Sequence, residues 1–335
     1  MRLGHVGNSD AASRRLSLCK RRVNVPLSCK RSHALDFFLF GGLKPSLHGL
    51  HERRQLQPNF DLPLLRRPVK IELDHVEKPL RKLRKMLDDF SADPCPEDVH
   101  ALRTHARRLE AAIAALVPAR SKEPRRVLKL LTPIRKAAGK VRDMDVLIED
   151  ALTLGTVRRA EGLVRLVEHL GEMRAKNAKK LRDTIFKHRG ETGARLKELS
   201  KVLKKRLEDE PGTLNGDAAP QILVTELSQW PQLNRENLHL FRLRIKELRY
   251  MLELSNEPNE QWIKWLGEVK DAIGEWHDWV GLLNIAKEVL DPGTDAEVLK
   301  RIKKRSDERF NAGLTAANQM RKRIFQPSKN GRGRT

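Results

Sequence analysis

Apolar residues recur every three or four positions from Val69 onward, and this spacing places them on one face of an α-helix. The pattern is interrupted by prolines and glycines, residue types that disrupt helices. The interruptions are at Pro94 and Pro96, Pro118 and Pro124, Gly190 and Gly193, Pro211 to Gly216, Pro231, Pro258, and Pro292 with Gly293. The intervening segments of roughly 15 to 30 residues are long enough for bundle helices, and they predict about eight or nine of them. We therefore expect an all-α protein.

The first 69 residues lack this helical period and mix serine, glycine, proline and basic residues. They carry 13 lysines and arginines against 4 acidic residues, a net charge of +9, which leaves +14 of the total +23 for residues 70–335. A segment with few acids and many arginines and serines also resembles a transit peptide. We expect residues 1–69 to be a disordered basic extension or an over-long gene model, and residues 326–335 to be a disordered basic tail.

The excess of positive charge in the sequence favours an anionic binding partner. The 335 residues include 67 lysines and arginines against 44 acidic residues, and such an excess attracts anions without specifying which one. Three cysteines without CxxC spacing predict neither a disulfide framework nor a zinc site, and they fit a reducing compartment. No apolar stretch approaches the roughly 20 residues that a membrane helix needs. We expect a cytoplasmic protein without a membrane span.

Recognisable catalytic motifs are missing from the sequence. It contains no HExxH, P-loop or GxSxG motif and no cluster of metal ligands, so we expect a protein that is not an enzyme and has no cofactor or metal. Phosphoryl transfer through His100 is the catalytic alternative. All five tryptophans lie between Trp230 and Trp279, at spacings that predict the core and helix interfaces. With aromatic residues at only 4% of the chain, recognition of single-stranded nucleic acid by base stacking is disfavoured.

Two sequence patterns occur twice in the same order. The segments HALRTHARRL, which begins at His100, and HLFRLRIKEL, which begins at His239, share the form H-x-x-R-x-x-x-(R/K)-x-L and lie 139 positions apart. Each is followed by the form G-x-x-(R/H)-D, at Gly139 to Asp143 and at Gly274 to Asp278, with an offset of 135. Two ordered matches at nearly equal offsets predict an internal duplication. We expect two homologous halves, at about residues 70–190 and 193–325, related by approximate two-fold symmetry.

In both copies the helical geometry separates an apolar face from a basic face. The predicted buried residues are Val99, Leu102, Ala106, Leu109, Ile113 and Leu116 in the first copy, and Leu238, Phe241, Ile245, Leu248 and Leu252 in the second. The opposite faces carry His100, Arg103 and Arg107 in one copy, and His239, Arg242, Lys246 and Arg249 in the other. A solvated face accepts any polar residue, whereas these two faces place histidine and arginine at matched positions. An anion site is therefore favoured over two solvated faces.

With these residues the chain resembles the CHAD domain, a histidine-marked α-helical domain that binds inorganic polyphosphate. The resemblance covers about residues 70–325 and rests on the two histidine motifs and on RDMDVL, which begins at Arg142. It implies two four-helix bundles related by pseudo-two-fold symmetry, with a shared basic concave surface that holds polyphosphate. The implied binding residues are His100, Arg103, Arg107, Arg108, Arg135, Lys136, Arg142, His239, Arg242, Lys246 and Arg249. It also implies a location at polyphosphate granules.

Closely spaced arginines suit a phosphate polymer because the guanidinium group can bind two phosphate oxygens at once, while lysine supplies a point charge. His100 lies about one turn into a helix that begins after Pro96, where the helix dipole also favours an anion. Asp143 and Asp278 cannot favourably contact a polyanion in their charged forms, so we expect them to pair with arginines and to fix their orientation. Asp145 has no predicted special role.

The second copy departs from the first in ways that lower its positive charge. Glu247 stands where the first copy has Arg108, and His277 stands where it has Arg142. Asp271 and Glu275 oppose Lys136 and Lys140 in the same alignment. The second half is therefore expected to contribute less positive charge to the site.

Two other kinds of partner remain open. A phosphate-directed basic surface also fits DNA or RNA bound without sequence preference. A scaffold that uses the same surface on an acidic protein is the second alternative. The sequence does not define the oligomeric state or the preferred polyphosphate length.

Overall fold

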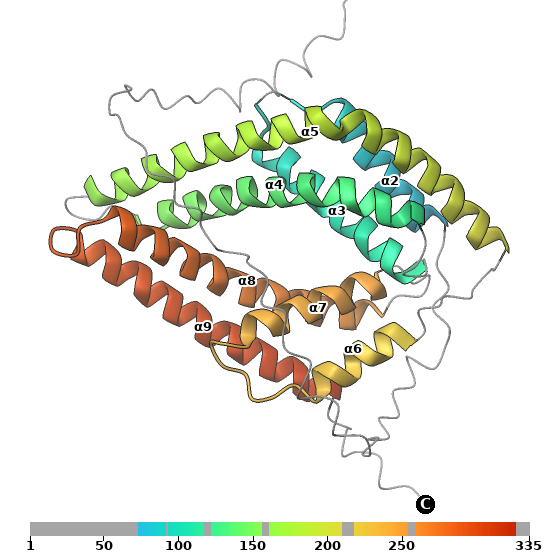
Figure 1. Cartoon of the computed structure of the whole chain (residues 1–335). Helices are drawn as coiled ribbons and strands as arrows, with labels where there is room; N and C mark the ends of the chain where they lie inside the picture. The colour runs from blue at the N-terminus through green and yellow to red at the C-terminus, as the bar shows by residue number, and fades with distance from the viewer. Residues whose placement is uncertain are drawn as a thin grey trace, which may run out of the picture. The chain divides into compact units, whose positions relative to one another are not determined.

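The structure is a computed structural model that describes residues 73–91, 93–116, 122–155, 161–209, 218–253 and 259–325. These residues form eight α-helices and no β-strand, which confirms the prediction of an all-α fold. The helices are α2 (Leu73–Asp88), α3 (Pro96–Leu116), α4 (Lys122–Leu152), α5 (Glu161–Asp209), α6 (Ala218–Ser228), α7 (Leu238–Leu252), α8 (Glu260–Val289) and α9 (Ala296–Phe325) (Figure 1). The predicted extension at residues 1–69 and the predicted tail at residues 326–335 lie outside the described residues.

Most helix ends fall at the predicted interruptions. Helix α3 begins at Pro96, α6 ends three residues before Pro231, and α8 begins two residues after Pro258. At the start of α8 the side chain of Asn259 accepts a hydrogen bond of 2.9 Å from the backbone N–H of Trp262. This contact satisfies one of the backbone donors that the first turn of a helix leaves free.

The helix break predicted at Gly190 and Gly193 is wrong. Helix α5 runs without interruption through both glycines, from Glu161 to Asp209. Ile185 lies before the glycines and Leu196 after them, and both are buried in the core formed with α2–α4. Packing of this continuous apolar face outweighs the roughly 1 kcal/mol that each glycine costs inside a helix. The first core therefore includes residues beyond the predicted end of the first half at residue 190.

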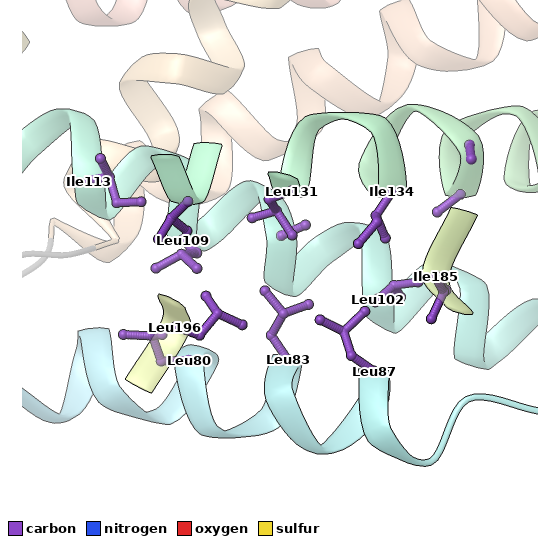
Figure 2. Packing of buried hydrophobic residues seen from close by; sticks show 14 of the residues in the cluster. Leu80, Leu83, Leu87, Leu102, Leu109, Ile113, Leu131, Ile134, Ile185 and Leu196 are labelled. Atoms are coloured by element: carbon purple, nitrogen blue, oxygen red, sulfur yellow. The ribbon is translucent and has the colours of Figure 1, made fainter. Parts of the chain in front are cut away.

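Helices α2–α5 enclose a core made almost entirely of leucine, isoleucine, valine and alanine (Figure 2). The labelled side chains are Leu80, Leu83, Leu87, Leu102, Leu109, Ile113, Leu131, Ile134, Ile185 and Leu196. Burial of each large aliphatic side chain stabilises the folded state by about 1.5–3 kcal/mol. On α3 this burial fixes the rotation of the helix, so that the opposite face carries His100 and Arg103.

Helices α6–α9 enclose a second core that contains most of the aromatic residues in the described part of the chain. The predicted apolar face of α7 is buried in it, from Leu238 to Leu252. Trp262 and Trp276 are buried in the same core, and Trp230 and Trp265 pack against it. Trp279 is also buried, in the cluster described next. The prediction that the tryptophans occupy the core and helix interfaces is confirmed.

A third apolar cluster joins α4 and α5 to α8 and α9. It includes Leu147 of α4 and Trp279 of α8. At its edge Arg165 of α5 donates a hydrogen bond of 2.6 Å to the buried carboxylate of Asp295, just before α9. Helices α4 and α8 are therefore packed together, and α3 also contacts α7. The two-fold relation between two homologous bundles stays a prediction.

Candidate anion-binding site

The basic face of α3 lies opposite its buried stripe, as predicted. Val99, Leu102 and Ala106 are completely buried in the first core. On the other side His100 is exposed, whereas Arg103 and Arg107 are partly buried. Arg107 lies 3.7 Å from the carboxylate of Glu110, and no hydrogen bond or ion pair joins Arg103 to another described residue. Helix α3 thus presents a cationic ridge in which the guanidinium group of Arg103 has no ion pair within the described part of the chain.

The matching face of α7 is also basic but more enclosed. His239, Arg242 and Lys246 are all partly buried. The Nε–H of Arg242 donates a hydrogen bond of 2.9 Å to the backbone carbonyl of Lys270 on α8. This contact holds the guanidinium group against α8 and leaves its terminal nitrogens available.

The two ridges come close enough for their charges to interact. Burial is the main reason that the pKa of Lys246 falls to about 7. Four neighbouring cations lower it further, namely Arg242, Arg107, Arg103 and Lys270. Two of these come from α3, one from α7 itself and one from α8. We call the five residues Arg103, Arg107, Arg242, Lys246 and Lys270 the central cluster.

The pKa values of the other members of the ridges describe the same neighbourhood. Burial lowers the pKa of Arg242, and the charge of Arg103 on the facing helix lowers it further. Partial loss of hydration also lowers the pKa of the largely exposed His100, with additional contributions from Arg142, Arg103 and Lys270. Coulomb energy falls with distance, so these shifts locate the cations of α3, α7 and α8 in one electropositive region.

Three of the cations at the centre of this region have no ion pair with an acidic residue that the structure describes. No ion pair joins Arg103, Arg242 or Lys246 to another residue in the described part of the chain. Partly buried cations without close counter-ions are unfavourable in the free protein, because like charges repel and burial removes hydration. An anion that entered this region would relieve both costs.

Asp143 and Asp278 lie beside the central cluster, but neither forms an ion pair with an arginine that the structure describes. Burial raises the pKa of Asp143, and the charge of Arg103 is the first of several that lower it again. Asp278 raises the pKa of Asp143, which places the carboxylates of α4 and α8 near each other. Asp278 also raises the pKa of Arg242. The two aspartates act on the arginines through their charge, at a longer range than the direct pairing that the sequence predicts.

The second histidine differs sharply from the first. The ring of His239 stacks on His277, with 4.3 Å between the ring centroids. Burial lowers the pKa of His239 to about 4, and the charge of His277 contributes next. His239 is therefore neutral near pH 7, and it can contribute hydrogen bonds to a ligand but no positive charge.

Two further predicted residues, both on α4, lie beside the α3 ridge. Arg142 acts on the pKa of His100, and its guanidinium lies 3.8 Å from Glu149. Arg135 donates a hydrogen bond to Glu110 and acts on the pKa of Arg107. These contacts place both arginines of α4 beside the α3 ridge, where they extend it in two directions.

Three predicted residues stand further from the centre by their contacts. Arg249 forms an ion pair of 2.6 Å with Glu253. Arg108 is exposed and lies near His105 on the side of α3 that faces Lys82 of α2. Lys136 is exposed on α4. Their role in binding stays a prediction.

Most of the acidic residues that distinguish the second copy form ion pairs outside the central cluster. Glu247 accepts a hydrogen bond of 2.9 Å from Arg244, which also donates to Glu226 of α6. Glu275 pairs with Arg309 of α9 at 3.0 Å. Asp271 forms an ion pair with the adjacent Lys270. Two of these three acids are thus compensated by arginines outside the central cluster, which reduces their effect on the site.

Sequence reasoning missed Lys270 and gave Tyr250 no binding role. Lys270 lies one helical turn before Gly274 of the repeated motif, so it shares a face of α8 with that glycine. Tyr250 lies near both ridges, because it acts on the pKa of Arg107 and of Arg242. The spacing to the motif glycine could have identified Lys270, whereas the position of Tyr250 depends on the approach of α3 to α7.

Asp145 has a structural role that the sequence did not indicate. It is buried and accepts a hydrogen bond of 2.7 Å from Arg174 of α5. Arg174 also donates to the backbone carbonyl of Pro94. The pair therefore ties α4 and α5 to the segment that precedes α3, which fixes the start of the ridge helix.

The described residues contain neither a membrane-spanning helix nor a metal-binding group. None of the described helices is long and apolar enough to cross a membrane. Among the same residues, histidine, cysteine and acidic side chains form no group that could hold a metal ion.

The comparison with protein families identifies the chain. The family model of the CHAD domain matches residues 74–286, which is more than half of the sequence. The chain belongs to the CHAD domain family. No curated protein matches it.

Two solved structures are similar to this CHAD domain. The crystal structure of the CHAD domain from the plant Ricinus communis has 19% sequence identity and a TM-score of 0.51, over 74% of this chain and 87% of the plant chain. PptA from Streptomyces chartreusis has 15% identity and a TM-score of 0.48, over 77% of this chain and 100% of PptA. The likeness to the plant domain shows that the two share the all-α fold. The lower score of PptA carries no further argument.

Proposed function

We propose that this CHAD domain binds inorganic polyphosphate on the surface that carries the central cluster, and that it does so without catalysing a reaction. The observation that carries the proposal is the set of cations from α3, α7 and α8 whose charges reach one another, three of them without an ion-pair partner among the described residues. A flexible polymer with one negative charge on each phosphate can neutralise several of them at once. Arginine side chains suit this role because they can bind phosphate oxygens through two parallel hydrogen bonds.

Several features favour an inorganic phosphate chain over nucleic acid. All five tryptophans are buried or pack against the cores, so they supply no exposed platform on which bases could stack. The candidate surface offers guanidinium and ammonium groups, which recognise phosphate and not base edges. Nucleic acid bound through its phosphates alone is the competing reading.

The first experiment removes from each ridge one arginine that has no ion pair with another described residue. The variant Arg103→Ala with Arg242→Ala should bind long-chain polyphosphate at least about 100-fold more weakly, since hydrogen bonds to charged groups contribute about 1.5–3 kcal/mol each. Isothermal titration calorimetry measures the affinity, and circular dichroism checks that the helical content is unchanged. Undiminished affinity of the double variant would contradict the proposal.

A charge-matched control separates a specific site from general attraction. Lys300 and Lys303 are exposed on α9, which supplies no member of the central cluster. The variant Lys300→Ala with Lys303→Ala loses the same net charge and should bind within about twofold of the wild type. Equal losses in the two variants would mean that net charge alone attracts the polymer.

Competition distinguishes the alternative partners. At modest salt, long-chain polyphosphate should displace bound duplex DNA, whereas the reverse displacement should need a large excess. DNA that displaces polyphosphate efficiently would favour the nucleic-acid reading, and co-purification with an acidic protein in the absence of polyphosphate would favour the scaffold reading. In cells the proposal predicts recruitment to polyphosphate granules, which a fluorescent fusion of the wild type should show and the double arginine variant should not.

A further inference from the structure

The repeated motif places a glycine beneath an arginine of each ridge. A β-carbon added to Gly139 of α4 would lie 3.6 Å from Nε of Arg103. A β-carbon added to Gly274 of α8 would lie 2.7 Å from Nη2 of Arg242, and 3.3 Å from its Cζ and Nε. Each guanidinium group therefore lies against the bare backbone of the neighbouring helix, at matched positions of the two sequence copies.

The two glycines differ in how much space they leave. A separation of 3.6 Å is an ordinary van der Waals contact, so a methyl group fits beside Arg103. A separation below 3.0 Å is one that real β-carbons essentially never show, so a methyl group at residue 274 would force the Arg242 guanidinium to move. The atom displaced is the end of a flexible side chain, so the backbone of α8 can remain where it is.

Other contacts fix Arg242 at this position. Its Nε–H bonds to the carbonyl of Lys270, one helical turn before Gly274. Asp278 lies one turn after Gly274 and raises the pKa of Arg242 through its charge. The backbone bond uses one of the five N–H donors of the side chain and leaves four on the terminal nitrogens. A guanidinium held in this way is oriented before an anion arrives, which reduces the ordering cost of binding.

We propose that Gly274 is a positioning residue of the anion site, because the absence of a side chain there leaves room for the guanidinium of Arg242 in its binding orientation. Position 139 does not need a glycine for this reason, since a methyl group fits beside Arg103. This inference rests on the proposed binding of polyphosphate at the central cluster. A helix interior favours alanine over glycine, so conformational preference does not explain a glycine at residue 274. The close approach of Arg242 does explain it.

The test compares alanine substitutions at three helical glycines. Gly274→Ala should weaken binding of long-chain polyphosphate by about tenfold, the effect of losing one well-oriented charged contact. Gly139→Ala should bind within about twofold of the wild type. Gly171→Ala is the matched control, because a β-carbon added there on α5 meets no atom within 4 Å. None of the three should lower the melting temperature, since alanine is the better helix former.

A second readout separates a lost contact from a general disturbance. The slope of log affinity against log salt concentration should decrease by about one for Gly274→Ala, as for Arg242→Ala, because one phosphate contact is lost in each. Adding Gly274→Ala to Arg242→Ala should cause no further loss. In the Arg242→Lys background, Gly274→Ala should change the affinity less than about twofold, because the guanidinium that meets the new methyl group is gone.

The outcomes distinguish this inference from the proposed function. Wild-type affinity of Gly274→Ala together with weak binding by Arg242→Ala overturns the role of Gly274 and leaves the polyphosphate site intact. An equal loss in the arginine and lysine backgrounds means that alanine disturbs the packing of α8, which also overturns it. Wild-type affinity of Arg242→Ala contradicts the site itself.

Discussion

The ridges of α3 and α7 carry the same sequence pattern in different surroundings. His100 is exposed, and Arg103 has no hydrogen bond or ion pair within the described residues. His239 is stacked on another ring, and Arg242 is anchored to the backbone of α8. The α3 ridge is thus open and adjustable, and the α7 ridge is enclosed and fixed. The comparison shows that a matched motif can supply an oriented contact in one half and an adaptable contact in the other.

The largest expected difference between the ridges is in the two arginines taken singly. Arg242→Ala should weaken polyphosphate binding by about 30-fold or more, and Arg103→Ala by about tenfold, because the fixed side chain loses less entropy on binding. Calorimetric titration at one salt concentration measures both. A greater loss for Arg103→Ala would reverse the assignment of the fixed and adjustable ridges.

The next effect is a pH dependence that belongs to the α7 ridge. Burial brings the pKa of Lys246 to about 7, so this side chain is largely neutral in the free protein at pH 8.5. A bound polyanion favours the charged form, and binding therefore takes up a proton. Affinity should rise by about fivefold to tenfold as the pH falls from 8.5 to 6.5. Lys246→Met should remove most of this rise in the same titrations.

The same lysine affects stability in a defined direction. Its folded pKa of about 7 lies below the value of about 10.4 in an unfolded chain, so the unfolded state binds more protons between these limits. Lys246 therefore makes the free energy of unfolding increase as the pH rises from 7 to 10. In denaturant titrations Lys246→Met should be more stable than the wild type at pH 7 and should show a weaker pH dependence. A less stable methionine variant would mean that Lys246 is better compensated than its neighbours indicate.

The smallest expected effect distinguishes the two histidines. His239, with a pKa of about 4, stays neutral from pH 6 to pH 8, so His239→Gln should change the affinity by a similar factor at both. His100 is exposed at the start of α3 and becomes protonated more readily when phosphate is near, so the loss caused by His100→Gln should be about threefold and larger at pH 6. Equal pH profiles for the two variants would contradict the contrast in their environments.

The sequence predicted the parts of this fold that depend on local periodicity. The apolar stripes of α3 and α7 determine which face is buried, and the basic face follows from the same rotation. The break predicted at Gly190 failed because the packing of Ile185 and Leu196 on both sides decides whether the helix continues. That packing is a tertiary interaction, and the positions of helix-disrupting residues in the sequence do not reveal it.

Within the site, the motif positions of Arg103, Arg242 and Lys246 identified residues that lie together, whereas Arg108 and Arg249 stand further from the centre. The contribution of Lys270 from another helix was not foreseen. Lys270 enters the central cluster only because α8 packs against α7. We expected Glu247 to lower the positive charge of the second half. However, Arg244 pairs with both Glu247 and Glu226, and the second contact depends on the position of α6. Ion pairs between helices decide the effective charge of a surface, and a single sequence does not specify them.

Helix α5 is one uninterrupted rod of 49 residues that belongs to two cores, so it connects the mechanical behaviour of these cores. Its residues from Ala178 to Leu203 pack with α2–α4, and its residues from Leu163 to Leu170 pack with α4, α8 and α9. If either core loosens, α5 loses packing contacts that hold it in place. Melting of one core is thereby coupled to the other, because both depend on the same continuous helix.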